Sequence, residues 1–125
     1  MPKASKDTAS HVEDMGVMLG HYENLDGYVV GFEHFREDAD ATPLFKGLPD
    51  DRCQSPHWGY VVSGSVTFSW PDHEETYEAG DAYYAPPGHI PSVKAGTEVI
   101  EFSPAEPYAQ TLDVITRNLA TLQAS

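Results

Sequence analysis

Short runs of strand-forming residues, separated by turn residues, fill most of this sequence and limit the folds open to it. β-Branched and aromatic residues are frequent in the runs, whereas Gly, Pro, Asp and Ser are frequent between them. Short strands at close spacing are typical of an antiparallel sandwich or barrel, so the chain is predicted to be all-β. The expected strands are Tyr28 to Phe35, His57 to Val62, Ser65 to Trp70, Glu74 to Glu78, Ala82 to Ala85 and Glu98 to Phe102.

The two ends of the chain have different patterns. Residues 1–10 mix Lys, Ser, Ala and Asp without periodicity and are predicted to form a disordered tail, which leaves 11–125 as a single domain. Between Val12 and Leu25 the apolar residues suit either a short helix or an edge strand. Near the C-terminus the apolar residues recur at helical spacing and predict an amphipathic helix, which must pack on its own barrel or on a second copy of the chain. Its apolar stripe consists of Tyr108, Leu112, Ile115, Leu119 and Leu122.

Charge and hydropathy exclude some partners. Twenty acidic residues against seven basic ones give a net charge of −13, which repels nucleic acid and anionic membrane surfaces. No apolar stretch has the length of a signal-peptide core or of a membrane span, so the protein is expected in the cytoplasm. The acidic residues are spread along the chain and are interpreted as a solubilising surface.

Cys53, His57 and His89 are the candidate metal ligands. Residues four apart on an extended chain project to the same face, so the side chains of Cys53 and His57 can converge. His89 follows Pro86-Pro87-Gly88, a rigid corner that suits a third ligand. Thiolate and imidazole together favour a divalent transition metal ion, with zinc expected first and iron, copper or nickel as alternatives. Cys53 could instead be a buried apolar residue or a reactive thiol, His57 a core histidine, and His89 a turn cap.

Two further segments resemble the cupin family over roughly residues 50–103. The stretch Tyr60-Val61-Val62-Ser63-Gly64 matches the strand ending of the first cupin motif, and Gly80 followed by Pro86-Pro87-Gly88 matches the second motif at the same spacing. The resemblance implies a jelly-roll β-barrel, often dimeric, with a metal held inside by three His and one Glu. A homodimer is therefore expected.

The metal ligands of the family are not kept in type. The family Glu falls on His57, its first two His fall on Asp51 and Cys53, and its last His falls on Pro91, two residues after His89. A substituted set in nearly the same places remains. Asp51 or Glu101 could complete it, although Glu101 is expected on the outer face because Ile100 and Phe102 form the more apolar face.

The function stays open at this level. Tyr60 and Tyr84 flank the candidate ligands, and a phenol near a metal can donate a proton, so both are the candidate catalytic residues. The leading hypothesis is a metal-binding cupin domain protein that binds or transforms a small organic molecule. The alternative is a non-catalytic module that senses a metabolite or a metal. Because protonated imidazole cannot ligate, metal affinity is expected to fall through the imidazole range of pH.

Overall fold

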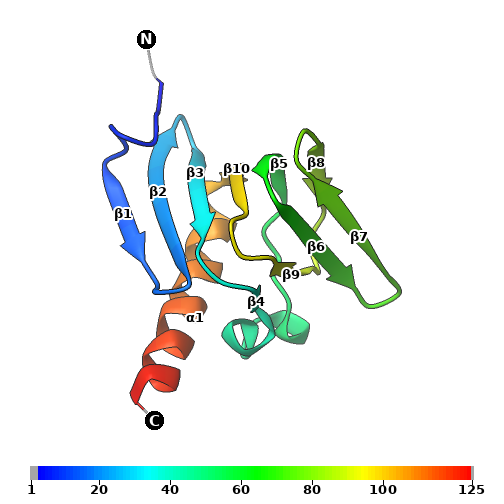
Figure 1. The fold of residues 1–125 in the computed structure, drawn as a ribbon. Helices are drawn as coiled ribbons and strands as arrows, with labels where there is room; N and C mark the ends of the chain where they lie inside the picture. The colour runs from blue at the N-terminus through cyan, green and yellow to red at the C-terminus, as the bar shows by residue number, and fades with distance from the viewer. Residues whose placement is uncertain (1–2, 125) are drawn as a thin grey trace.

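The computed structural model describes residues 3–124 as two antiparallel β-sheets followed by a helix (Figure 1). The larger sheet has the strand order β1-β2-β3-β10-β5-β8, and the smaller has the order β4-β9-β6-β7. The strands of the larger sheet are β1 (His11–Asp14), β2 (Met18–Leu25), β3 (Tyr28–Phe35), β5 (His57–Ser63), β8 (Ala82–Ala85) and β10 (Glu98–Pro104). Those of the smaller sheet are β4 (Ala39–Asp40), β6 (Ser65–Trp70), β7 (His73–Glu78) and β9 (Ile90–Val93). The predicted all-β jelly roll with a C-terminal helix is confirmed.

The segment that suited either a helix or a strand forms the β1–β2 hairpin. Gly16 takes a positive φ of 82° at its turn, and Met15 N donates to the Met18 carbonyl at 2.8 Å. Along β2, Met18 and Tyr22 are buried, which is the period of two expected of a strand. Residues 1 and 2 lie outside the described part of the chain, and the disordered tail over 1–10 stays a prediction.

The main core lies between the two sheets. Phe68 of β6 is 2% exposed and contacts the rings of Trp70, Tyr77 and Tyr83. Along β5, His57 and Val61 face this interior, whereas the side chains of Trp58 and Tyr60 are exposed. The members of the core are Val61, Val66, Phe68, Trp70, Tyr83, Ala85, Val93 and Val99.

Strand β10 presents the opposite face to the one that the sequence favoured. Val99 and Ser103 are buried at 4% and 3% exposure, whereas Phe102 is 40% exposed. Glu101 has the same phase as Val99 and Ser103, so its carboxyl lies on the inner face. The expectation failed because the outer face of this sheet is itself apolar, so hydrophobicity could not distinguish its two faces.

Helix α1 (Ala105–Ala124) follows β10 and packs against β10 and β3 of the larger sheet. Its residues Val114 and Ile115 pack against a second cluster formed by Phe45, Leu48 and Cys53. Asn118 Nδ2 donates to the Leu44 and Lys46 carbonyls, at 2.7 and 2.8 Å, at the short helix Thr42–Phe45. The helix therefore covers its own domain. Within residues 3–124, no helix combines the length and hydropathy that a membrane span requires.

Candidate metal centre

Backbone hydrogen bonds hold the two halves of the candidate centre together. Cys53 N donates to the His89 carbonyl at 3.0 Å, and Gly88 N donates to the Cys53 carbonyl at 2.7 Å. Gly88 has a φ of 96°, which glycine adopts without strain and which turns the chain into this bridge. The segment before β5 and the corner before β9 are thus fixed against each other.

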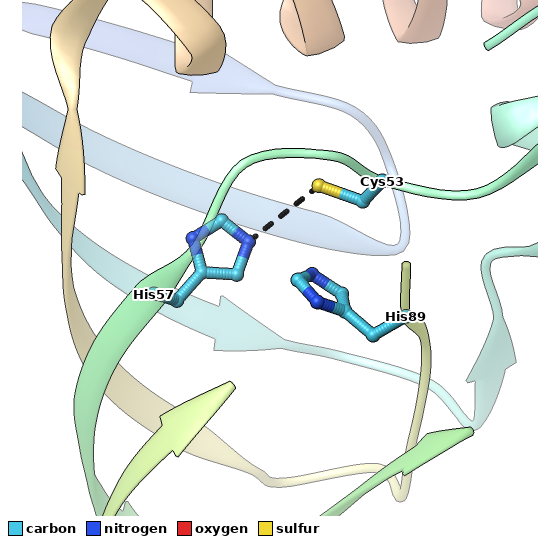
Figure 2. Close-up of side chains that lie close together, drawn as sticks. All are labelled: Cys53, His57 and His89. Atoms are coloured by element: carbon cyan, nitrogen blue, oxygen red, sulfur yellow. Dashed lines mark hydrogen bonds between the residues drawn. The ribbon is translucent and has the colours of Figure 1, made fainter. Parts of the chain in front are cut away.

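The side chains of Cys53, His57 and His89 converge inside the fold (Figure 2). One donor atom from each lies within 4.8 Å of the other two, and Cys53 Sγ is 3.7 Å from His57 Nε2. The three residues are 1%, 8% and 0% exposed, respectively. His89, which is distant in sequence, therefore meets Cys53 and His57 at one point from which water is largely excluded.

Hydrogen bonds at the outer nitrogens orient both imidazoles. His89 Nδ1 lies 2.8 Å from the Pro86 carbonyl, which can only accept, so the proton is on Nδ1 and Nε2 carries a free lone pair. His57 Nδ1 lies 2.7 Å from Ser103 Oγ, which leaves its Nε2 for the centre. Among the described residues, His89 Nε2 is the buried side-chain nitrogen or oxygen for which no hydrogen-bond partner is found. A buried, unpaired lone pair is costly unless something binds it.

The thiol of Cys53 and the imidazole of His57 have the separation of two ligands of a tetrahedral metal ion. Zinc–sulfur and zinc–nitrogen bonds of about 2.3 and 2.0 to 2.1 Å imply about 3.6 Å between sulfur and nitrogen donors. The observed distance from Cys53 Sγ to His57 Nε2 is 3.7 Å. The Pro86 carbonyl at the outer nitrogen of His89 is also a partner that metal-binding histidines commonly have.

Burial changes the pKa of all three groups. It lowers the pKa of His57 to about 4. The pKa of His89 falls to about 3, because burial and the nearby positive charge of a protonated His57 both oppose its protonation. Both imidazoles are therefore neutral near pH 7, as ligation requires. Burial raises the pKa of the Cys53 thiol to about 11, against the opposing hydrogen bonds of Ser55 and Thr111. A metal ion must therefore displace a thiol proton to bind.

Neither candidate catalytic tyrosine reaches this centre. Tyr60 and Tyr84 are 46% and 48% exposed on the outer face of the larger sheet. Successive side chains of a strand point to opposite faces, so Tyr60 points outward when His57 points inward. For the same reason Tyr84 points outward while its neighbour Tyr83 is buried. The expectation that these two residues border the pocket is therefore corrected.

The two residues considered as a fourth ligand also lie outside the cluster. Asp51 is exposed, and its Oδ1 accepts a hydrogen bond from Gly47 N at 2.9 Å. Glu101 faces inward, but within residues 3–124 the group that could hold an ion has only three members. The geometry leaves a fourth tetrahedral position without a side-chain ligand from the described residues.

Sequence reasoning missed two hydroxyls beside the centre. Ser103 bonds His57, and Thr111 of α1 places Oγ1 3.7 Å from Cys53 Sγ. Correct assignment of the inner face of β10 would have found Ser103. The position of Thr111 depends on how the helix packs against the sheets, which the sequence does not indicate.

Replacing Ser103 with alanine is expected to weaken zinc binding by about 10- to 100-fold, because the His57 ring loses the partner that orients it. The measurement is zinc affinity by competition with a chelating dye, and Ser69→Ala on the outer side of β6 is the matched control. Equal affinity in the two variants would show that Ser103 does not orient a ligand.

No family model and no curated protein matches the sequence. Solved structures match the fold. An RmlC-like cupin from Shewanella frigidimarina NCIMB 400 is 17% identical over 82% of this chain and 90% of that chain, with a TM-score of 0.56. The chain has a cupin fold.

Two further solved structures of similar fold are described as a polyketide cyclase and as an iron(II) complex. The polyketide cyclase RemF from Streptomyces resistomycificus is 15% identical over 85% of this chain and 80% of that chain, with a TM-score of 0.60. HppE, solved with iron(II), is 12% identical over 82% of this chain but only 60% of that chain, with a TM-score of 0.56. At these identities the likeness extends to the cupin fold alone.

Proposed function

We propose that this cupin-fold chain holds one divalent transition metal ion, zinc in the first place, on Cys53, His57 and His89. The observation that carries the proposal is the lone pair of His89 Nε2, buried and unpartnered among the described residues, beside a thiol and a second imidazole. Three protein ligands leave one position for an exogenous oxygen, which is the pattern of sites that bind or transform ligands. We infer that a small organic molecule binds there through a carbonyl or carboxylate oxygen.

A bound metal ion would act as a Lewis acid on that oxygen. The residues of the chain supply the rest: the outer hydrogen bonds of His57 and His89 fix the rings, and α1 excludes water from Cys53. A closed sphere of four protein ligands would instead have favoured the non-catalytic sensing module.

The test is the element-resolved metal content of protein prepared without an affinity tag. We expect close to one equivalent of a single transition metal per chain, and a large loss in Cys53→Ala. A wild-type protein that carries no metal, and takes up none when zinc is supplied at neutral pH, would refute the proposal.

Zinc affinity is expected to rise about tenfold for each pH unit between about pH 6 and 9. The cause is the thiol of Cys53, whose pKa of about 11 requires one proton to leave for each ion bound. The imidazole pKa values of about 4 and 3 lie below this window, so the dependence first expected in the ordinary imidazole range moves to lower pH. Chelator competition at several pH values measures the slope. A flat profile would exclude the Cys53 thiolate as a ligand.

We also propose that the outer face of the larger sheet binds a second copy of the chain. Trp58 and Phe102 are 43% and 40% exposed there, and Trp58 stacks on Tyr84 at a ring distance of 5.0 Å. A hollow of about 600 Å³ on this face is lined mostly by apolar side chains. Exposed, contiguous apolar surface of this kind marks interfaces.

Trp58→Glu is expected to raise the dimer dissociation constant by more than about 100-fold, because a charge replaces a central aromatic anchor. Analytical ultracentrifugation measures it, with Thr76→Glu on the exposed face of β7 as the control. A wild-type protein that is monomeric at high concentration, or a variant that dimerises normally, would contradict the assignment.

A further inference from the structure

A second group of polar side chains lies on the inner face of the larger sheet, apart from the metal ligands. Glu33 of β3 accepts a hydrogen bond from the Tyr22 hydroxyl at 2.6 Å. Glu101 of β10 accepts one from the Tyr83 hydroxyl. The ring of Tyr108 from α1 lies 5.9 Å from that of Tyr22. The proposed function uses none of these groups.

Strand register shows that this arrangement is built into the sheet. One row runs across five strands, with Tyr83 opposite Gly59, Gly59 opposite Glu101, Glu101 opposite Gly31, and Gly31 opposite Tyr22. A Cβ at Gly59 would lie 2.4 Å from the Tyr83 ring, and one at Gly31 would lie 2.7 Å from the Tyr22 ring. The glycines leave the space through which each phenol reaches its carboxyl.

The same register makes Glu33 and Glu101 neighbours. Glu33 is opposite Val99, so Glu101 is its diagonal partner on the same face of the β3–β10 pair. Within residues 3–124, neither carboxyl has an ion-pair partner. The groups that face them are the hydroxyls of Tyr22, Tyr83 and Tyr108 and, further off, the thiol of Cys53.

This surrounding favours one retained proton. Burial, together with the charge of Glu101, raises the pKa of Glu33 well above the ordinary glutamate value. Burial also raises the pKa of Glu101, against the opposing hydrogen bond of Tyr83. Two buried carboxyls that repel each other lose their protons in separate steps, so between those steps the pair holds one carboxylic acid and one carboxylate, the two forms that acid–base catalysis needs.

The pair lies next to the candidate metal centre. Glu101 precedes Ser103 by two residues on the inner face, about 7 Å along the strand, and Ser103 bonds His57. The Phe68 ring contacts both Tyr83 and His89, at ring distances of 5.4 and 5.1 Å. The Phe68 ring therefore connects Tyr83, which bonds Glu101, with the candidate ligand His89.

We infer that Glu33 and Glu101 form an acid–base pair that moves a proton on a small carbonyl compound bound in the interior. One carboxylate takes a proton from the carbon next to the carbonyl: the C–H bond breaks, an O–H bond forms, and the electron pair passes to the carbonyl oxygen. The carboxylic acid of the other glutamate then returns a proton to a carbon or to the oxygen of the compound. The pair ends with the one proton it began with, so no oxidant or reductant is needed. This inference rests on the proposed function and narrows it to isomerisation.

The first test is a carbon-13 NMR titration of protein labelled at the glutamate side-chain carboxyls. Two resonances are expected with midpoints above about pH 6, well above the ordinary glutamate value of about 4.3. Glu33→Gln and Glu101→Gln should each remove one and lower the midpoint of the other, because their mutual repulsion is lost. Glu98→Gln, on the outer face of β10, should change neither. Ordinary midpoints for both carboxyls would overturn the inference.

The second test follows deuterium exchange into the methyl group of pyruvate by proton NMR, with zinc-loaded protein in deuterated buffer. Each Gln variant should slow exchange by at least about 100-fold, and Glu98→Gln should leave it unchanged. Exchange no faster than in buffer with free zinc, or surviving in both Gln variants, would overturn the inference. Zinc content is measured on the same samples. If the wild-type protein binds no zinc, the proposed function is wrong. The carbon-13 titration then still shows whether the two carboxyls have raised pKa values.

Discussion

Replacing His89 with alanine is expected to lower zinc affinity by more than about 100-fold, beyond what the loss of an outer hydrogen bond costs. The substitution removes one of three donors and leaves a two-ligand site on Cys53 and His57. Because His89 Nε2 is buried without a partner found among the described residues, its removal also relieves an unsatisfied group in the metal-free protein. The fold should therefore survive, as circular dichroism can show. Chelator competition measures the affinity.

The matched control is His11→Ala, because His11 is exposed on β1, away from the centre. Cys53→Ala should lose affinity as His89→Ala does. If neither variant loses metal, the site is elsewhere. If both lose metal and also unfold in the absence of metal, the residues act as core packing, and the affinity loss says nothing of ligation.

Much of the fold could be predicted from local sequence. The strands from His57 to Glu78 are separated by strong turn signals, and the structure places them as predicted. Strand β9 was missed because Ile90–Val93 contains Pro91 and follows a proline-rich corner, a pattern typical of loops. Its pairing with β6 is a tertiary effect. The β1–β2 hairpin was ambiguous for a related reason: glycines at 16 and 20 weaken helix and strand patterns alike.

The candidate centre was predictable in part. Chain periodicity and the proline corner indicated that Cys53, His57 and His89 converge, and the structure brings them together; metal binding itself stays a prediction. Tyr60 and Tyr84 were chosen by proximity in sequence, although strand alternation turns Tyr60 away from His57. Proximity along a strand is a poor guide when neighbouring side chains face opposite sides.

The carboxyl pair could not be predicted, because it depends on register across five strands. The sequence around Glu33 and Glu101 does not indicate that each carboxyl meets a tyrosine hydroxyl. Each tyrosine ring occupies the space that a glycine on a neighbouring strand leaves open. A one-residue slip would put both carboxyls in solvent. Glycines on neighbouring strands opposite inward aromatics are the signal to seek once a register is known.

The glycine opposite Tyr83 in this register is expected to have a large effect on stability. Gly59→Ala should lower the free energy of unfolding by about 3 kcal/mol, because the new methyl group would lie 2.4 Å from the Tyr83 ring. Gly59 has no positive φ, so the backbone accepts alanine and the cost arises from the collision alone. Urea denaturation of the metal-free protein measures the change.

The control is the same substitution in a Tyr83→Ala background. With the ring gone, alanine at position 59 should be neutral or stabilising by up to about 1 kcal/mol, since a strand glycine loses more chain entropy on folding than alanine does. The two substitutions should therefore couple strongly in a double-mutant cycle. Additive effects would mean that Tyr83 does not cross Gly59, and the phenol could not then reach Glu101 as the register requires.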